Sequence, residues 1–457
     1  MTQQRASRAC DPCKRRKIRC NGQKKCQQCT HIGLRCTYAP HPVQRARKER
    51  RRGSVIAECR TWSSSGSVPS SIQSHPNPAF FLDFLPSYIE YVYPLSPVVT
   101  EAEARDMILH MNDCRDAASF AYIFAAVTLN LGRSDPLQQE STKRDQISIL
   151  LTRSLEHRRP FHLDSKPGIT DLMTSLFTQM CSIGLRRLDL GFLYLREAIS
   201  LLYMLQADLD DESAPRWQRA YWECFMHERF TALTYQRPTC LTPLSRLPVH
   251  DPSLPEHVED GFNHNIMNFC LVDQEFLHFL MGDRSGVTVD WIEKKQQQLE
   301  DTDWHREVSR LPEILQADLI ITRHWLRTLT WQIALSNTLL SSASSPGSSL
   351  LSLSFPLRLS NQLRQFLRAI PRDIVAIHGS GILEKLFEIA NTITDVVLHL
   401  HCAPGNETIQ RIHDILFLKN FVFSFAGFQA LRPAVLTQKF EQIRLKYPEI
   451  KEIELLL

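Results

Sequence analysis

From about residue 79 onward, apolar residues recur at the three- and four-residue spacing of amphipathic helices, and strand-like alternation is rare. The clearest predicted helices cover residues 80–92, 104–114, 118–131, 141–158, 190–206, 214–235, 265–280 and 317–340, with three or four more beyond Phe355. We therefore predict an all-α body over residues 79–457, large enough for one or two helical subdomains. A Ser-rich stretch at 341–354 is the predicted internal loop.

The N-terminal region has a different pattern, in which six of the thirteen cysteines lie within residues 10–36. The spacing C-x2-C-x6-C occurs twice, so that Cys10, Cys13 and Cys20 are followed sixteen residues later by Cys26, Cys29 and Cys36. The stretch is therefore an internal repeat.

Metal thiolates explain this repeat better than disulfides. The first residues, MTQQRASRAC, lack the apolar segment of a signal peptide, so we expect a reducing compartment. No window of 18 apolar residues is present either, because Lys419, Arg323 and Arg327 interrupt the most apolar stretches. We therefore expect no membrane segment.

Counting ligands indicates two zinc ions that share thiolates. Zinc takes four ligands, so two ions need eight positions where six sulfurs exist, and two thiolates must bridge. The repeat restricts the bridging pair to Cys10 with Cys26, Cys13 with Cys29, or Cys20 with Cys36. A site for one ion, or ligation by His31 or His41, would leave the repeat unexplained.

Charge indicates an anionic partner for the same region. Residues 5–52 contain 16 Lys or Arg and two acidic residues, a net charge of +14, whereas the rest of the chain carries a net charge of −10. Six thiolates around two zinc ions carry a charge of only −2, too little to require so many cations. Nucleic acid is the expected partner.

The segments CDPCKRRKIRC, CNGQKKCQQC and LRC resemble the fungal binuclear zinc cluster transcription factors, whose cysteine spacing they match at every gap. The resemblance implies two zinc ions, with Cys10 and Cys26 as the bridging ligands. It also implies that the first helix presents its C-terminal end to the major groove of double-stranded DNA at a CGG-like triplet.

The same resemblance assigns roles to the basic residues. Arg16 and Lys17 fall at the positions that read guanine O6 and N7. Lys14, Arg15 and Arg19 suit phosphates. Many members carry a proline in the loop between the repeats, but this chain has Lys24 and Lys25 there, which are additional candidates for phosphate contacts.

The predicted domains are the zinc cluster at residues 1–39, a basic arm and Ser/Pro-rich linker at 40–78, and the helical domain at 79–457. The basic run from Arg45 to Arg52 suits a phosphate-tracking arm or a nuclear import signal, so we expect a nuclear protein. No coiled coil follows the arm, and any homodimer should form through the helical domain. Its candidate stripe consists of Leu319, Leu326, Leu329, Ile333 and Leu340, although a stripe of this kind is more often a buried core seam.

Two segments of the body resemble the regulatory domain of fungal transcription factors. They are PSYIEYVYPLSPVV near residue 90 and RWQRAYWECFMHERFTALTYQRPTCL at residues 216–241. Trp217, Tyr221 and Phe225 share a helix face, which predicts a core position, and Arg237 and Pro238 should end that helix.

Enzyme motifs are incomplete throughout the chain. HGSG at 378–381 is not a nucleophile elbow, HERF at 227–230 lacks a second histidine, and no phosphate-binding glycine motif occurs. HLHC at 399–402 with His413 is a weak metal candidate, and we interpret the seven isolated cysteines as small buried apolar residues.

These patterns predict a regulator of genes transcribed by RNA polymerase II, and not an enzyme. Transcription machinery and an unidentified small-molecule effector are its further expected partners. The compact architecture favours a pathway-specific regulator of a fungal secondary metabolite gene cluster. Regulation of carbohydrate or nitrogen utilisation is the first alternative, and a helical enzyme or scaffold with a DNA anchor is the second.

Overall fold

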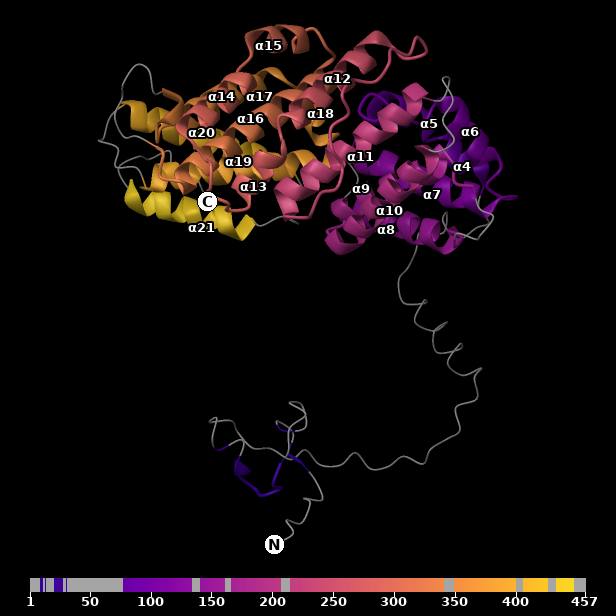
Figure 1. Cartoon of the computed structure of the whole chain (residues 1–457), viewed down its shortest axis with the longest axis horizontal. Coiled ribbons are helices and arrows are strands. Elements are labelled where there is room, and N and C mark those ends of the chain that lie inside the picture. The colour runs from indigo at the N-terminus through magenta and orange to yellow at the C-terminus, as the bar shows by residue number, and fades with distance from the viewer. Residues whose placement is uncertain are drawn as a thin grey trace. The chain divides into compact units, whose positions relative to one another are not determined.

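The chain divides into two compact units, Met1–Ser74 and His75–Leu457, each considered separately below. The computed structural model describes residues 9–10, 13, 20–27, 30, 77–133, 140–160, 166–206, 214–340, 349–399, 406–425 and 433–447. Within these ranges the second unit is built from helices and contains no β-strand, which confirms the predicted all-α body (Figure 1). The predicted domain boundaries at residues 39 and 78 remain predictions.

The helices of the body differ widely in length, and the long ones dominate the packing (Figure 1). In chain order they are α4 Pro78–Leu82, α5 Leu85–Ser87, the π-helix η1 Tyr88–Val92, α6 Glu101–Leu109, α7 Arg115–Leu131, α8 Glu140–His157, α9 Ile169–Gly184, α10 Leu188–Gln206, α11 Ala214–Tyr235, α12 Glu256–Cys270, α13 Gln274–Leu280, α14 Val289–Leu299, α15 Thr302–Val308, α16 Glu313–Ser336, the 3-10 turn η2 Ser349–Leu351, α17 Phe355–Ala369, α18 Arg372–Ala376, α19 Gly379–His399, α20 Asn406–Phe423 and α21 Pro433–Lys446.

Two large apolar cores hold the body together. The first lies among α4 to α12, and the second lies among the C-terminal helices from α13 to α21. Phe230 of α11 packs against both cores, which places α11 at their junction, between the indigo-to-magenta and orange-to-yellow helices of Figure 1. The prediction of one or two helical subdomains fits this pair of joined cores.

Two predicted helices are broken in the structure. The segment 80–92 divides into α4, α5 and η1, with Pro86 in the first turn of α5, because proline lacks the N–H that a continuing helix requires. The segment 265–280 divides at Asp273, whose side chain accepts a hydrogen bond of 2.8 Å from the Phe276 N–H and so begins α13.

Helices α9, α14 and α15 were absent from the predicted set. In α9, hydroxyl groups interrupt the apolar pattern. The Thr174, Thr178 and Ser182 hydroxyls each donate to the carbonyl four residues earlier, at 2.6 to 2.7 Å. These polar side chains are therefore buried without an unmet hydrogen bond, and the helix packs in the first core.

Helix α11 confirms the predicted core role of its aromatic residues. Trp217, Tyr221, Trp222 and Phe225 are all buried, and the helix ends at Tyr235, just before Arg237 and Pro238. Its polar side chains bond to the loop after η1 and to the segment that follows α11. Arg219 Nε donates to the Pro97 carbonyl at 2.8 Å, which joins the two segments that resemble the fungal regulatory domain.

The stripe of apolar residues on α16 lies inside the protein. Leu319, Leu326, Leu329 and Ile333 are at most 4% exposed, and Leu340 packs against the second core. The stripe is therefore a core seam, which was the favoured of its two interpretations, and it does not offer a surface to a second copy. No described helix combines the length and the apolar character needed to cross a membrane.

The isolated cysteines behave as predicted at two positions. Cys181 and Cys224 are fully buried, and burial raises the pKa of both thiols. Cys114 and Cys270 are partly exposed, and Cys59 and Cys402 lie outside the described residues. Cys240 is exposed, which contradicts its predicted burial; it lies in the loop after α11, where its Sγ contacts Arg196 Nη1 at 2.7 Å.

Candidate metal centre and nucleic-acid interface

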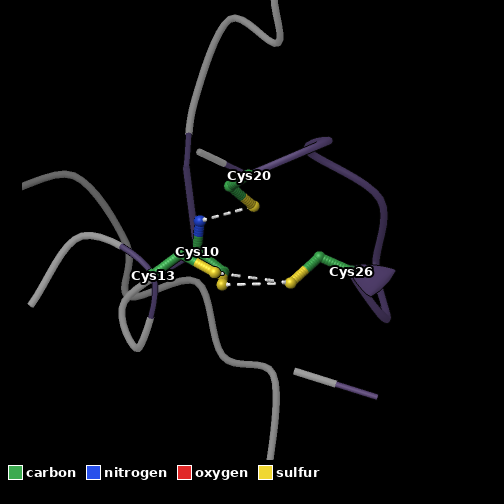
Figure 2. A group of neighbouring side chains, drawn as sticks. All are labelled: Cys10, Cys13, Cys20 and Cys26. Atoms are coloured by element: carbon green, nitrogen blue, oxygen red, sulfur yellow. Dashed lines mark hydrogen bonds between the residues drawn. The ribbon is translucent and has the colours of Figure 1, made fainter. Parts of the chain in front are cut away.

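Four of the six predicted zinc ligands lie together in the first unit (Figure 2). The sulfur atoms of Cys10, Cys13, Cys20 and Cys26 are all within 4.8 Å of one another. Cys26 Sγ lies 3.6 Å from Cys10 Sγ and 3.6 Å from Cys13 Sγ. Cys10, Cys13 and Cys26 are fully buried.

These separations fit a shared zinc ion. A tetrahedral ion with Zn–S bonds of about 2.3 Å holds its sulfur ligands about 3.8 Å apart. A disulfide needs about 2.05 Å, far less than the 3.6 Å found between these sulfurs. Four soft thiolates in this arrangement are the donor set that zinc takes in closed structural sites.

Backbone N–H groups prepare Cys20 as a thiolate ligand. The Gly22 N–H donates to Cys20 Sγ at 3.4 Å. The Cys10 N–H donates to the same sulfur at 3.5 Å (Figure 2). Burial raises the pKa of this thiol, but the two N–H groups lower it, and the net pKa lies below its ordinary value. The thiolate is the form that binds zinc.

Local backbone geometry positions the second half of the repeat. Gly22 adopts a φ of +74°, a left-handed conformation that glycine takes without a steric penalty, and this turn follows Cys20 directly. The Thr30 N–H then donates to the Cys26 carbonyl at 3.0 Å, the bond of a helical turn. Gly22 was not among the predicted site residues, although a glycine between ligands is a turn signal.

The structure describes only part of the predicted site. Cys29 and Cys36, the candidates His31 and His41, and the arm from Arg45 to Arg52 lie outside the described residues. The predicted DNA contacts Lys14, Arg15, Arg16, Lys17 and Arg19 lie outside them as well. Lys24 and Lys25 are described, and both are exposed in the loop between the repeats. They remain candidates for phosphate contacts.

The weaker metal candidate receives no support. Within the described ranges, the cysteine cluster is the only gathering of three or more His, Cys, Asp or Glu side chains close enough to hold an ion. His399 Nδ1 lies 2.8 Å from the Asp395 carbonyl of its own helix, which is the ordinary role of a histidine at a helix end. The rest of HLHC, residues 400–402, lies outside the described residues.

Comparison with known proteins agrees with this metal centre. Residues 8–46 match the family model of the fungal Zn(2)-Cys(6) binuclear cluster domain. This class of domain binds two zinc ions through six cysteines and contacts DNA. Residues 8–46 are therefore a fungal Zn(2)-Cys(6) binuclear cluster domain, the kind of domain that fungal transcription regulators carry, and its cofactor is a pair of zinc ions.

Curated relatives extend the likeness through the helical body. A probable sucrose utilization protein of Candida albicans is 24% identical over 436 residues, which cover 90% of this chain and 83% of the relative. A maltose fermentation regulatory protein of Saccharomyces cerevisiae is 24% identical over 450 residues, covering 92% and 90%. The transcription factor kojR of Aspergillus flavus is 30% identical over 148 residues, covering 32% and 22%. No solved structure matches the chain.

Proposed function

We propose that this protein is a nuclear, sequence-specific regulator of carbohydrate utilisation genes transcribed by RNA polymerase II. The observation that carries the proposal is the likeness over about nine tenths of the chain to relatives named for sucrose utilization and maltose fermentation. The likeness to kojR covers only 32% of the chain. The first prediction, a regulator of a secondary metabolite cluster, is therefore less well supported than the carbohydrate alternative.

The zinc cluster supplies the DNA-binding surface in this proposal, with Cys10 and Cys26 as bridging ligands. Bridging thiolates should be related by the repeat, the family resemblance implies this pair, and Cys26 Sγ lies 3.6 Å from Cys10 Sγ. Cys13 and Cys20 then complete the first ion's tetrahedron, and Cys29 and Cys36 complete the second. This arrangement satisfies both ions with six sulfurs.

DNA recognition separates into base reading and phosphate contact. Replacing Lys17 or Arg16 with Ala should cost about 1–3 kcal/mol at the preferred CGG-like site and relax the preference for that triplet. Replacing Lys24 or Lys25, which are exposed in the loop, should instead lower the affinity for DNA of every sequence by the same factor. Each lost phosphate contact should reduce the slope of log K against log salt by about one.

Binding titrations at several salt concentrations, on cognate and scrambled duplexes, separate these two roles. Lys446→Ala serves as a control, because Lys446 lies in α21 of the helical body and donates to the Leu398 carbonyl there at 2.6 Å. If Lys17→Ala lowers cognate and scrambled affinity by the same factor, the assignment of base reading to Lys17 is wrong.

The regulated genes can be found by mapping genome occupancy together with transcripts in a deletion strain. We expect occupied promoters upstream of sugar transport and glycoside hydrolysis genes, whose induction by the corresponding sugar disappears in the deletion strain. A strain with Cys26→Ala should reproduce the deletion. Occupancy and transcript loss confined to a biosynthetic gene cluster would instead restore the secondary metabolite prediction.

Paired sites remain part of the proposal. One cluster reads about three base pairs, too few to specify a promoter, so a second copy joined through the helical domain would supply the missing specificity. The buried stripe on α16 does not supply that contact. Light scattering on the full chain, with and without a duplex containing two triplets, measures this association directly.

A further inference from the structure

The helical body contains a cavity of about 150 Å³ where its two apolar cores meet. Helices α7, α9, α11, α12, α16 and α19 and the loop after η1 all contribute lining residues. Helix α11 contributes Glu223, Met226, His227 and Phe230, and Phe230 packs against both cores. The core-facing aromatics of this helix were predicted, but its polar cavity-facing side chains were not.

Five polar atoms around this cavity have no hydrogen-bond partner within the described part of the chain. They are Ser96 Oγ, Gln179 Oε1, Glu223 Oε1, Asn265 Oδ1 and His378 Nε2. Ser96, Gln179 and Glu223 are at most 2% exposed, and His378 is 8% exposed. A buried polar atom without a hydrogen-bond partner destabilises a fold, so five around one space indicate that water or a ligand occupies it.

All five unpaired atoms can accept a hydrogen bond, and the Ser96 hydroxyl can also donate one. Gln179, Glu223 and Asn265 present carbonyl or carboxylate oxygens. The His378 ring bonds to the Ile314 backbone, and because Nε2 has no partner, the donating nitrogen is Nδ1. Burial lowers the pKa of His378, which leaves the ring neutral and Nε2 with a free lone pair. A molecule with several O–H or N–H groups can satisfy this set in place of ordered water.

The charges around the cavity disfavour an anionic occupant. Lys385 is the only Lys or Arg among the described lining residues. Its ammonium donates to Asp318 Oδ1 at 2.8 Å and to Thr322 Oγ1 at 2.6 Å. A phosphate or carboxylate would therefore meet Glu223 and Asp318 without a spare cation.

The apolar part of the cavity wall and the cavity volume restrict the class of ligand further. Phe230 and Phe269 line the cavity beside the acceptors, and aromatic rings pack well against the C–H faces of sugar rings. A protein cavity of about 150 Å³ accommodates a ring the size of benzene. A neutral molecule with several hydroxyls meets the polar and apolar conditions, and the volume limits the molecule to a single ring.

We propose that this cavity binds a small neutral polyhydroxylated molecule, no larger than a single sugar ring. The site stands on its own geometry and does not depend on which genes the protein regulates. Because six helices from both cores contribute to it, an occupant would stabilise the packing of one half of the body against the other. A second hollow of about 610 Å³ is a poorer candidate, because its polar side chains pair with each other, as Gln332 does with Glu388 at 2.6 Å.

Isothermal titration calorimetry on the full-length, zinc-loaded protein tests the class of ligand. The probes are D-glucose and myo-inositol as single rings, maltose as two rings, and putrescine as a cationic amine. We expect saturable binding of a single-ring probe and a higher Tm in its presence. Absence of saturable binding by both single-ring probes overturns the proposal, as does tighter binding of maltose or putrescine.

Two asparagines on α12 provide a matched pair for locating the site. Asn265 lines the cavity, whereas Asn263 does not, and both have an Oδ1 without a partner among the described residues. Asn265→Leu should weaken binding of the single-ring probe about tenfold, and Asn263→Leu should change it less than twofold.

Ser96→Ala is the milder second variant, because it removes one hydroxyl and leaves the packing intact; it should weaken binding about threefold or more. Equal effects of Asn263→Leu and Asn265→Leu, together with no effect of Ser96→Ala, would place binding elsewhere and overturn the proposal. DNA binding by the same variants measures the zinc cluster separately. Loss of ligand binding in the helical body can therefore be distinguished from loss of DNA binding.

Discussion

Replacing Cys26 with Ala should remove both zinc ions from the protein and abolish sequence-specific DNA binding. Cys26 Sγ lies 3.6 Å from two other cysteine sulfurs, and Cys26 forms with Cys10 the repeat-related pair inside the four-sulfur group. A bridging thiolate belongs to both tetrahedra, so its loss leaves each ion with three protein ligands. Structural zinc contributes about 10–16 kcal/mol to the folding of small metal domains, so the cluster should unfold.

Elemental analysis of purified full-length variants measures this effect. Wild type and Cys240→Ala should each contain two zinc ions, because Cys240 is an exposed residue of the helical body. Cys10→Ala should behave like Cys26→Ala, and Cys20→Ala should lose the first ion more readily than the second. A Cys26→Ala protein that keeps one firmly bound zinc and its DNA preference would show that Cys26 is not a bridge.

The zinc chemistry was accessible from sequence because it depends on residues close together in the chain. The repeated spacing gave the ligands, and ligand counting gave two ions, but three bridging pairs remained possible from spacing alone. The family resemblance selects Cys10 with Cys26, and the structure adds that Cys26 Sγ lies 3.6 Å from Cys10 Sγ. Gly22, whose left-handed backbone follows Cys20, has no side chain and was therefore easy to overlook.

In the body, helices with a simple amphipathic pattern were predicted. Helix α9, whose buried face contains hydroxyl groups hydrogen-bonded within the helix, was not predicted. Helix α11 occupies the predicted residues, whereas α9 was missed because Thr and Ser hydroxyls that bond within the helix disguise its buried face. Periodicity also joined α12 to α13, since it does not register that the Asp273 side chain caps a new helix.

The cavity could not be predicted from local sequence. Ser96, Gln179, Glu223, Asn265 and His378 come from five separate segments, and each is an ordinary polar residue in its own segment. Their common property, an acceptor atom without a partner, exists only when the two cores are packed together. Such a property belongs to the tertiary structure, and sequence periodicity contains no information about it.

Replacing Lys385 with Met should lower the free energy of unfolding of the helical body by about 3–5 kcal/mol, because it leaves a buried carboxylate without its cation. Lys385 is 6% exposed at its side chain and Asp318 is 17% exposed, and their charged atoms are 2.8 Å apart. Methionine keeps the length and apolar stem of lysine, so the loss measures the charge and not a cavity. Chemical denaturation at pH 7 gives the difference.

The pH dependence gives this prediction a definite sign. Burial raises the pKa of Asp318, but Lys385 lowers it, with further lowering by His378 and by a hydrogen bond from Thr322, and the net pKa lies below the ordinary value. The ionised carboxylate therefore stabilises the wild type above about pH 4, and this contribution is lost as the pH falls through the folded-state pKa. In Lys385→Met, burial dominates and raises the pKa of Asp318. As the pH falls, protonation of Asp318 removes the uncompensated charge from the variant. The difference in free energy of unfolding between wild type and variant should therefore shrink between pH 7 and pH 4.

Two control variants distinguish a buried ion pair from a general loss of packing. Asp318→Asn combined with Lys385→Met removes both charges and should recover most of the lost stability, because neither partner remains uncompensated. Arg105→Ala breaks an exposed pair with Glu101, each side chain 50% exposed, and should change the free energy of unfolding by less than about 1 kcal/mol. If the double variant is as unstable as Lys385→Met, and the deficit stays constant with pH, the charge of Asp318 does not control the stability of this junction between the two cores.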